Sequence, residues 1–170
     1  DYEQVFDYLK AINASAVMYD GNKVNEALFE SINSQLSTVN CSPSPVLKMM
    51  SVKNDTELAG ERIAMRKDAV ALTRFFYWLE KEALKTPQTE ITLAAKLGEF
   101  RAMGENYTDD SFCTIAGWKG NGAIVHYHAT EEECANIEGE GVLLLDSGGQ
   151  YLDGTTDITR TVWVGNPSNI

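Results

Sequence analysis

The sequence predicts an α+β fold that is preceded by the end of an α/β domain. Two stretches between residues 54 and 100 carry apolar residues at helical spacing, and strand-like segments follow Gly104. Long helices followed by an antiparallel set of strands are typical of the α+β class. The first 50 residues differ, because they alternate between helix-like and strand-like segments and hold too few strands to close a sheet of their own.

The first segment of the chain has α/β character. Its apolar spacing predicts helices over residues 2–11 and 22–36, and a short apolar run over residues 16–19 predicts a strand that ends at Asp20-Gly21. Two prolines make residues 41–45 extended. We therefore expect residues 1–50 to be the C-terminal part of an α/β domain.

A long helix is predicted from residue 54 to about residue 85. Asn54 and Glu57 have the spacing of a capping box, only Gly60 interrupts the helical pattern, and Pro87 ends it. Such a helix is long for a small domain and would serve as a scaffold along a sheet.

The second helix begins near Thr89 or Thr92, either of which can cap it, and continues through Phe100. The aromatic cluster at residues 75–78 of the first long helix is assigned to core packing.

Four strands are predicted after Gly104, over residues 111–116, 123–128, 141–146 and 157–164. The third of them contains Val142–Leu145, a continuously apolar run, so we expect it to be buried on both faces.

Two aspartates lie at the ends of the last two predicted strands. Asp146 closes the buried strand, and Asp157 opens the next one. A hairpin centred between Tyr151 and Leu152 would place these carboxylates directly opposite each other, with Thr159 opposite Leu144. Like charges in that arrangement destabilise a sheet, and either a divalent cation or a shared proton relieves the repulsion.

Other arrangements of the two aspartates stay open. If the turn at Asp153-Gly154 shifts the pairing of the two strands, Asp146 and Asp157 would be set about four residues apart instead of opposite each other. Alternatively, one aspartate caps a turn and the other is solvated. Asp153 itself is interpreted as a turn residue, because the segment lacks the alternating acids of a calcium-binding loop.

The chain contains 2 histidines, His126 and His128, on one face of the predicted strand 123–128. A histidine in a strand is commonly structural, but an imidazole beside a metal-bound water could move a proton near pH 7. Both roles stay open for these residues.

The amino-acid composition limits the kinds of molecule that the chain is expected to bind. The chain of 170 residues has 25 acidic residues against 14 Lys and Arg, a formal net charge of −11. Such a chain repels nucleic acid and anionic membrane surfaces, so neither is an expected partner. No apolar run approaches the roughly 20 residues of a membrane span. Three cysteines without paired spacing indicate reduced thiols, and no signal peptide is recognised, which together favour the cytoplasm.

The segment Leu143–Thr161, LLLDSGGQYLDGTTDITRT, resembles the first metal-ligand segment of X-prolyl aminopeptidase (aminopeptidase P), a pita-bread metallopeptidase. Asn121–Tyr127, NGAIVHY, is similar to the strand that precedes it in the family. Val52–Leu58 and Phe75–Glu80 are similar to the opening helix of the catalytic domain. The resemblance covers about residues 50–165.

The resemblance implies a site with two divalent metal ions, usually Mn²⁺, with Zn²⁺ or Co²⁺ as alternatives. Asp146 and Asp157 would be carboxylate ligands of these metals, and His126 the substrate-side histidine. A metal-bridging hydroxide would attack the carbonyl before proline, so the expected substrate is a peptide with proline in second position. A homodimer is compatible with the resemblance.

The family pattern also requires a His and two Glu further along than Ile170. We therefore expect residues 51–170 to be the first half of a pita-bread metallopeptidase domain, inactive without the remainder of the catalytic domain. Two alternatives remain: a prolidase, which cleaves Xaa-Pro dipeptides, and a non-catalytic pita-bread module that binds peptides or proteins. The presence of both Asp146 and Asp157 counts against the binding module.

Overall fold

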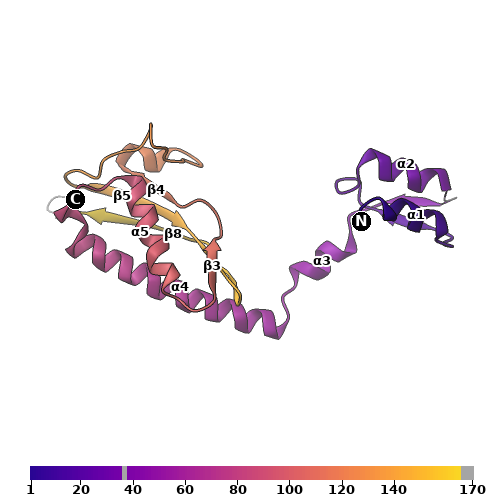
Figure 1. Cartoon of the computed structure of the whole chain (residues 1–170), viewed down its shortest axis with the longest axis horizontal. Coiled ribbons are helices and arrows are strands. Elements are labelled where there is room, and N and C mark those ends of the chain that lie inside the picture. The colour runs from indigo at the N-terminus through magenta and orange to yellow at the C-terminus, as the bar shows by residue number, and fades with distance from the viewer. Residues whose placement is uncertain (36–37, 166–170) are drawn as a thin grey trace. The chain divides into compact units, whose positions relative to one another are not determined.

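The computed structural model describes residues 1–35 and 38–165, which fold into two compact units divided between Lys53 and Asn54 (Figure 1). Each unit has its own secondary structure. No helix within these described ranges is both long enough and apolar enough to cross a membrane.

The first unit combines a parallel pair of strands with helices. Its elements are α1 (Gln4–Ala11), β1 (Val17–Tyr19), α2 (Glu26–Gln35), β2 (Val39–Cys41) and α3 (Pro45–Ser51). β1 and β2 pair in parallel, with Val17 opposite Val39. The parallel pair agrees with the α/β character predicted for this segment.

The first unit differs from the prediction at the start of α2 and in an additional helix, α3. α2 begins at Glu26 rather than Asn22, because the N–H groups of Lys23 and Val24 both donate to the Asp20 carbonyl and close a turn first. The end of that predicted helix, at Leu36, lies outside the described residues. The helix α3 was not predicted; Pro45 occupies its first turn, where the missing N–H costs nothing.

The second unit opens with two long helices, as predicted. α4 (Asp55–Lys81) runs along the unit, a short 3₁₀ turn η1 (Ala83–Lys85) follows it, and α5 (Glu90–Ala102) packs back against α4 (Figure 1). The capping box is confirmed, since the Glu57 N–H donates to Asn54 Oδ1 at 2.9 Å and the Asn54 N–H to Glu57 Oε2 at 2.8 Å. Thr89 caps α5 by accepting from the Thr92 N–H, and the Thr92 hydroxyl oxygen accepts from the Thr89 N–H in return.

The strands of the second unit form two antiparallel sheets. One has the order β4-β5-β8, with β4 (Ile115–Trp118), β5 (Gly141–Ser147) and β8 (Ile158–Val164); the other has the order β3-β6-β7, with β3 (Tyr107–Asp110), β6 (Gly149–Tyr151) and β7 (Gly154–Thr155). With α4 and α5 against this antiparallel structure, the predicted α+β class is confirmed.

The hydrophobic core lies between the two helices and one face of the β4-β5-β8 sheet. The fully buried members include Phe75 of α4, Leu93 and Leu97 of α5, and Leu143 and Leu145 of β5. Phe76 and Trp78 pack at its edge, whereas Tyr77 is 66% exposed. The aromatic cluster is therefore core only in part, because successive helical residues point in different directions.

Two of the four predicted strands are wrong. Residues 111–116 are not one strand, because β3 ends at Asp110 and β4 begins at Ile115. Residues 123–128 are not a strand either: a 3₁₀ turn, η2 (Lys119–Ala123), is followed by irregular chain in which His126 has a positive φ of 55°. The strands over 141–146 and 157–164 are confirmed to within one residue at their ends.

A tight turn at Leu152 and Asp153 packs against the first half of α4. At Gly60 an added Cβ would lie 2.2 Å from the Asp153 carbonyl oxygen, so only glycine permits this approach. Lys67 of α4 pairs with the Asp153 carboxylate, and the Asn106 side-chain amide also donates to it. These two hydrogen bonds, chiefly the one from Lys67, lower the pKa of Asp153. Asp153 is thus a turn residue, as predicted.

We predict that Gly60→Ala lowers the free energy of unfolding by about 1–3 kcal/mol, because the new methyl must displace backbone. Gly98 of α5 is the matched control, since a Cβ there meets nothing within 4 Å. Gly98→Ala should raise stability by about 0.5–1 kcal/mol through its better helix propensity. Urea unfolding of both variants measures this; equal effects would contradict the close contact at Gly60.

Candidate functional site

The β4-β5-β8 sheet has one face packed on the helices and one open face. In β5 the buried residues are Gly141, Leu143, Leu145 and Ser147, whereas Val142 is 40% exposed and Leu144 and Asp146 are half-buried. The expectation that Val142–Leu145 is buried on both faces is therefore wrong. Asp146 lies on the open face, where its carboxylate keeps access to solvent.

Asp146 faces Thr159 rather than Asp157. The ladder pairs Asp146 with Thr159 and Leu144 with Thr161. The predicted register fails because Tyr151 pairs with Gly154, which centres the turn between Leu152 and Asp153 instead of one residue earlier. A turn displaced by one residue shifts every pairing along the hairpin by two.

The Thr159 hydroxyl donates a hydrogen bond of 2.8 Å to Asp146 Oδ1. This contact fixes the carboxylate on the open face and leaves its other oxygen available.

Asp157 lies on the same open face, diagonal to Asp146. It directly precedes β8, and burial alternates along this stretch: Thr156 and Ile158 are buried, whereas Asp157 and Thr159 are exposed. In a regular antiparallel ladder, diagonal neighbours are separated by roughly 7–8 Å between Cα atoms, a distance that side chains can span. The direct opposition predicted for the two aspartates is wrong, but they share a face.

The two carboxylates have the chemistry of hard-metal ligands. Within residues 1–35 and 38–165, neither Asp146 nor Asp157 forms an ion pair, so no protein cation compensates either charge. Carboxylate oxygens on an open face suit a divalent cation. Across the same described residues, no three His, Cys, Asp or Glu side chains gather to hold a metal. The pair therefore fits part of a metal centre.

His126 lies in irregular chain rather than in the predicted strand, and its side chain is exposed. Close contacts place η2 over the open face of the sheet: a Cβ on Gly117 would lie 2.7 Å from the Gly122 Cα, and one on Gly122 would lie 3.2 Å from the Leu144 Cβ. The chain that leads to His126 thus starts on the side of the sheet that carries Asp146. Among the described residues, no hydrogen bond or ion pair joins His126 or His128 to either aspartate.

A buried carboxylate, Glu90, holds the irregular chain around His126. Glu90 is the first residue of α5 and has no exposed surface. Four groups donate to its oxygens: the Tyr127 hydroxyl at 2.6 Å, the Trp118 N–H at 2.7 Å, the Ala135 N–H at 2.8 Å and the Asn121 amide at 3.0 Å. A negative charge is also favourable at a helix N-terminus. Glu90 therefore ties η2 and residues 127–135 to the helix.

Tyr127 directly follows His126. In the predicted strand, its side chain would have lain on the face opposite His126. Its ring is half-buried, and burial together with the hydrogen bond to Glu90 raises the pKa of Tyr127 to about 12. Neutral Tyr127 can donate to Glu90, whereas its phenolate would face a buried carboxylate.

The buried polar residues Asp68, Glu90 and Arg101 were not predicted, although their spacing in the sequence is informative. Glu90 and Arg101 fall on the same apolar face of α5 as Leu93 and Leu97, and Asp68 falls on the buried face of α4. A charged residue in an apolar helical stripe is expensive to bury unless it is paired, so such positions mark polar networks.

We predict that the stability contributed by Tyr127 is present below pH 10 and is lost as the pH rises from about 10 to about 12, because the folded-state pKa lies above the ordinary value of a tyrosine. Across this window, the free energy of unfolding should fall more steeply in the unmodified chain than in Tyr127→Phe. Tyr77→Phe, at an exposed site, is the control and should follow the unmodified chain. Parallel curves for all three would contradict the buried Tyr127–Glu90 contact.

Comparisons with known proteins place the second unit in a family. The sequence model of metallopeptidase family M24 matches residues 59–170. The chain is 47% identical over 126 residues to "Aminopeptidase P2" of Arabidopsis thaliana, a match that covers 74% of this chain and 18% of the relative.

Two solved structures share the fold. X-prolyl aminopeptidase from Caenorhabditis elegans, described as a cytosolic enzyme with a di-nuclear active site, matches with a TM-score of 0.79 and 35% identity over 98% of this chain and 28% of its own. Prolidase from Pyrococcus furiosus matches with a TM-score of 0.76 and 19% identity over 99% of this chain and 47% of its own, which shows the fold alone.

The chain spans about a fifth of the length of the plant relative and about a quarter of the nematode structure. The predicted partial pita-bread fold is confirmed by these matches. Since the family model covers most of the second unit, the chain belongs to metallopeptidase family M24.

Proposed function

We propose that this chain is part of a metal-dependent aminopeptidase that releases the N-terminal residue from peptides with proline in second position. One observation carries the proposal: Asp146 and Asp157 lie on the same open sheet face inside the segment that matches family M24, and within residues 1–35 and 38–165 neither forms an ion pair with a protein cation. Relatives and a structural neighbour named as aminopeptidase P or X-prolyl aminopeptidase support the substrate class.

Asp146 and Asp157 are proposed as carboxylate ligands of two divalent cations, with Mn²⁺ as the expected metal and Zn²⁺ or Co²⁺ as alternatives. The structural neighbour with a di-nuclear active site supports two metals. When bound, such cations supply Lewis-acid activation of water and of the scissile carbonyl.

The chain's own residues then have distinct tasks. The Thr159 hydroxyl occupies Asp146 Oδ1 and so directs the remaining oxygen outward. Asp157 presents its carboxylate from the residue directly before β8. An imidazole nitrogen of His126 is proposed to bind the substrate peptide or to move a proton during cleavage, for which an exposed histidine is suited near neutral pH.

Domain bounds, the further metal ligands, the cellular location and the assembly are proposed in addition. Residues 1–50 are proposed as the end of an α/β domain and residues 51–170 as the first half of the pita-bread domain. A His and two Glu ligands would come from the remainder of the catalytic domain, so the 170-residue chain alone would be inactive. Cytoplasmic location and a homodimer are proposed as well, the former supported by a neighbour described as cytosolic.

The test uses the complete polypeptide that carries this segment, loaded with Mn²⁺. We expect release of the first residue from an Xaa-Pro-Xaa tripeptide, and loss of that activity with a chelator. Asp157→Asn should reduce kcat/KM by more than about 100-fold, beyond the usual effect of residues that only support a ligand.

Asp109→Asn is the matched control, because Asp109 is an exposed carboxylate on β3 and its removal changes the net charge equally. Activity should be unchanged in this variant. Cleavage of Xaa-Pro dipeptides but not tripeptides would instead favour a prolidase, and chelator-insensitive activity would refute the metal assignment.

A further inference from the structure

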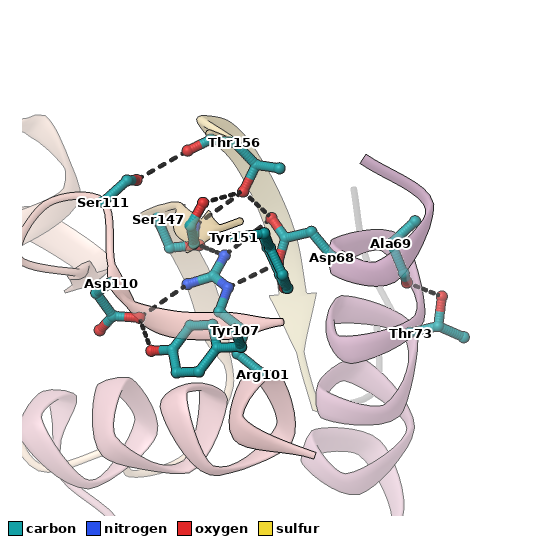
Figure 2. Close-up of polar contacts among 11 residues, drawn as sticks. Asp68, Ala69, Thr73, Arg101, Tyr107, Asp110, Ser111, Ser147, Tyr151 and Thr156 are labelled. Atoms are coloured by element: carbon teal, nitrogen blue, oxygen red, sulfur yellow. Dashed lines mark hydrogen bonds and ion pairs between the residues drawn. The ribbon is translucent and has the colours of Figure 1, made fainter. Parts of the chain in front are cut away.

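A buried ion pair joins the two long helices of the second unit. Asp68 of α4 and Arg101 of α5 have no exposed surface. The Arg101 Nε donates to Asp68 Oδ1 at 2.7 Å and the Arg101 Nη2 to Asp68 Oδ2 at 3.3 Å, so the contact is bidentate (Figure 2). Such a pair has a defined orientation, because both side chains are held at two points.

The same two side chains reach the strands. Arg101 Nη2 donates to the Ser147 hydroxyl at 3.0 Å, and the Thr156 hydroxyl donates to Asp68 Oδ2 at 2.6 Å. Thr156 Oγ1 in turn accepts from the Gly149 N–H at 2.8 Å. Figure 2 shows Ser147 and Thr156 converging on the ion pair from the strand side. Both residues are buried, at 0% and 1% exposure.

Ser147 directly follows Asp146, and Thr156 directly precedes Asp157. Since side chains alternate across a strand, fixing Ser147 and Thr156 inward directs the two aspartates to the opposite, open face. We propose that Asp68 and Arg101 are positioning residues that set the placement of Asp146 and Asp157 relative to each other. This inference rests on the proposed function in so far as the two aspartates are metal ligands.

The backbone between the aspartates is equally constrained. A Cβ on Gly148 would lie 2.0 Å from the Thr156 carbonyl oxygen and 2.2 Å from the Ser111 hydroxyl. The two segments that carry Asp146 and Asp157 are therefore in close contact at Gly148. Movement of Thr156 would be transmitted directly to Asp157.

The chemical composition of this hydrogen-bond network indicates that it orients side chains rather than that it adds to the free energy of unfolding. A buried ion pair contributes little net stability, because the cost of removing both charges from water offsets their attraction. Among the described residues, Arg101 Nη1 also finds no hydrogen-bond acceptor; Asp110 Oδ1 lies 3.6 Å from it. Apolar side chains could fill this space, but they could not orient the hydroxyl group of Ser147 in β5 and that of Thr156, which lies just before β8.

Thr156→Val tests the inference, because valine keeps the shape of threonine and removes only the hydroxyl that links Asp68 to the strand. In the complete polypeptide, we expect the Kd for Mn²⁺, measured by calorimetry, to rise about 10- to 100-fold, as when a partner of a metal ligand is lost. Thr156→Ser should restore the affinity of the unmodified protein. Ser147→Ala provides a second variant, with the same expected direction, in case Thr156→Val does not fold.

Leu93→Ala is the control for a purely structural role. Leu93 is fully buried in the core, and its apolar side chain cannot form a hydrogen bond with Ser147 or Thr156. This substitution should lower the Tm and leave Mn²⁺ affinity unchanged. Unchanged Mn²⁺ affinity in Thr156→Val, or a loss no greater than in Leu93→Ala at an equal drop in Tm, would overturn the inference.

A metal-free readout separates this inference from the proposed function. Amide hydrogen exchange at residues 146–148 and 156–159 should accelerate in Thr156→Val relative to the rest of the second unit, and uniformly in Leu93→Ala. If the unmodified protein binds no Mn²⁺, the proposed function fails. Local acceleration would then still support positioning of the two aspartates, and its absence would overturn it.

Discussion

The buried ion pair between Asp68 and Arg101 is the interaction on which the rest of the second unit depends. It joins α4 to α5 and, through Ser147 and Thr156, joins both helices to the two strands beside the candidate ligands. The apolar core holds the helices on the sheet, but a hydrophobic contact is not directional. The ion pair and its hydrogen bonds supply the direction, because a hydrogen bond weakens steeply when its donor and acceptor are misaligned.

Two buried carboxylates divide the organisation of the candidate site between them. Asp68 constrains the strands that carry Asp146 and Asp157, while Glu90 constrains η2 and the irregular chain around His126. Both carboxylates lie on helices, and both are fully buried. Different hydrogen-bond networks therefore hold the candidate metal ligands and the histidine. The Asp68 network connects α4 and α5 to the segments beside Asp146 and Asp157, and the Glu90 network connects α5 to β4 and to the chain around His126.

The open face of that sheet has the character expected of an active-site wall. Asp146, Asp157 and Thr159 are accessible there, whereas the opposite face is packed against α4 and α5. In the part of the chain that the structure describes, neither carboxylate pairs with a protein cation, and solvent-accessible carboxylate oxygens suit a divalent metal ion. Both aspartates lie inside the segment that matches metallopeptidase family M24.

The sequence by itself determined the elements whose cause is local. The capping box at Asn54, the helix after Thr89 and the strand 141–146 follow from neighbouring residues, and the segment around Asp146 and Asp157 identified the family. Tertiary structure decided the rest. The register that pairs Asp146 with Thr159 depends on where a turn packs against Gly60, and residues 123–128 are not a strand because Tyr127 bonds to the distant Glu90. Contacts between residues far apart in the chain have no local signature, so only the folded chain could reveal them.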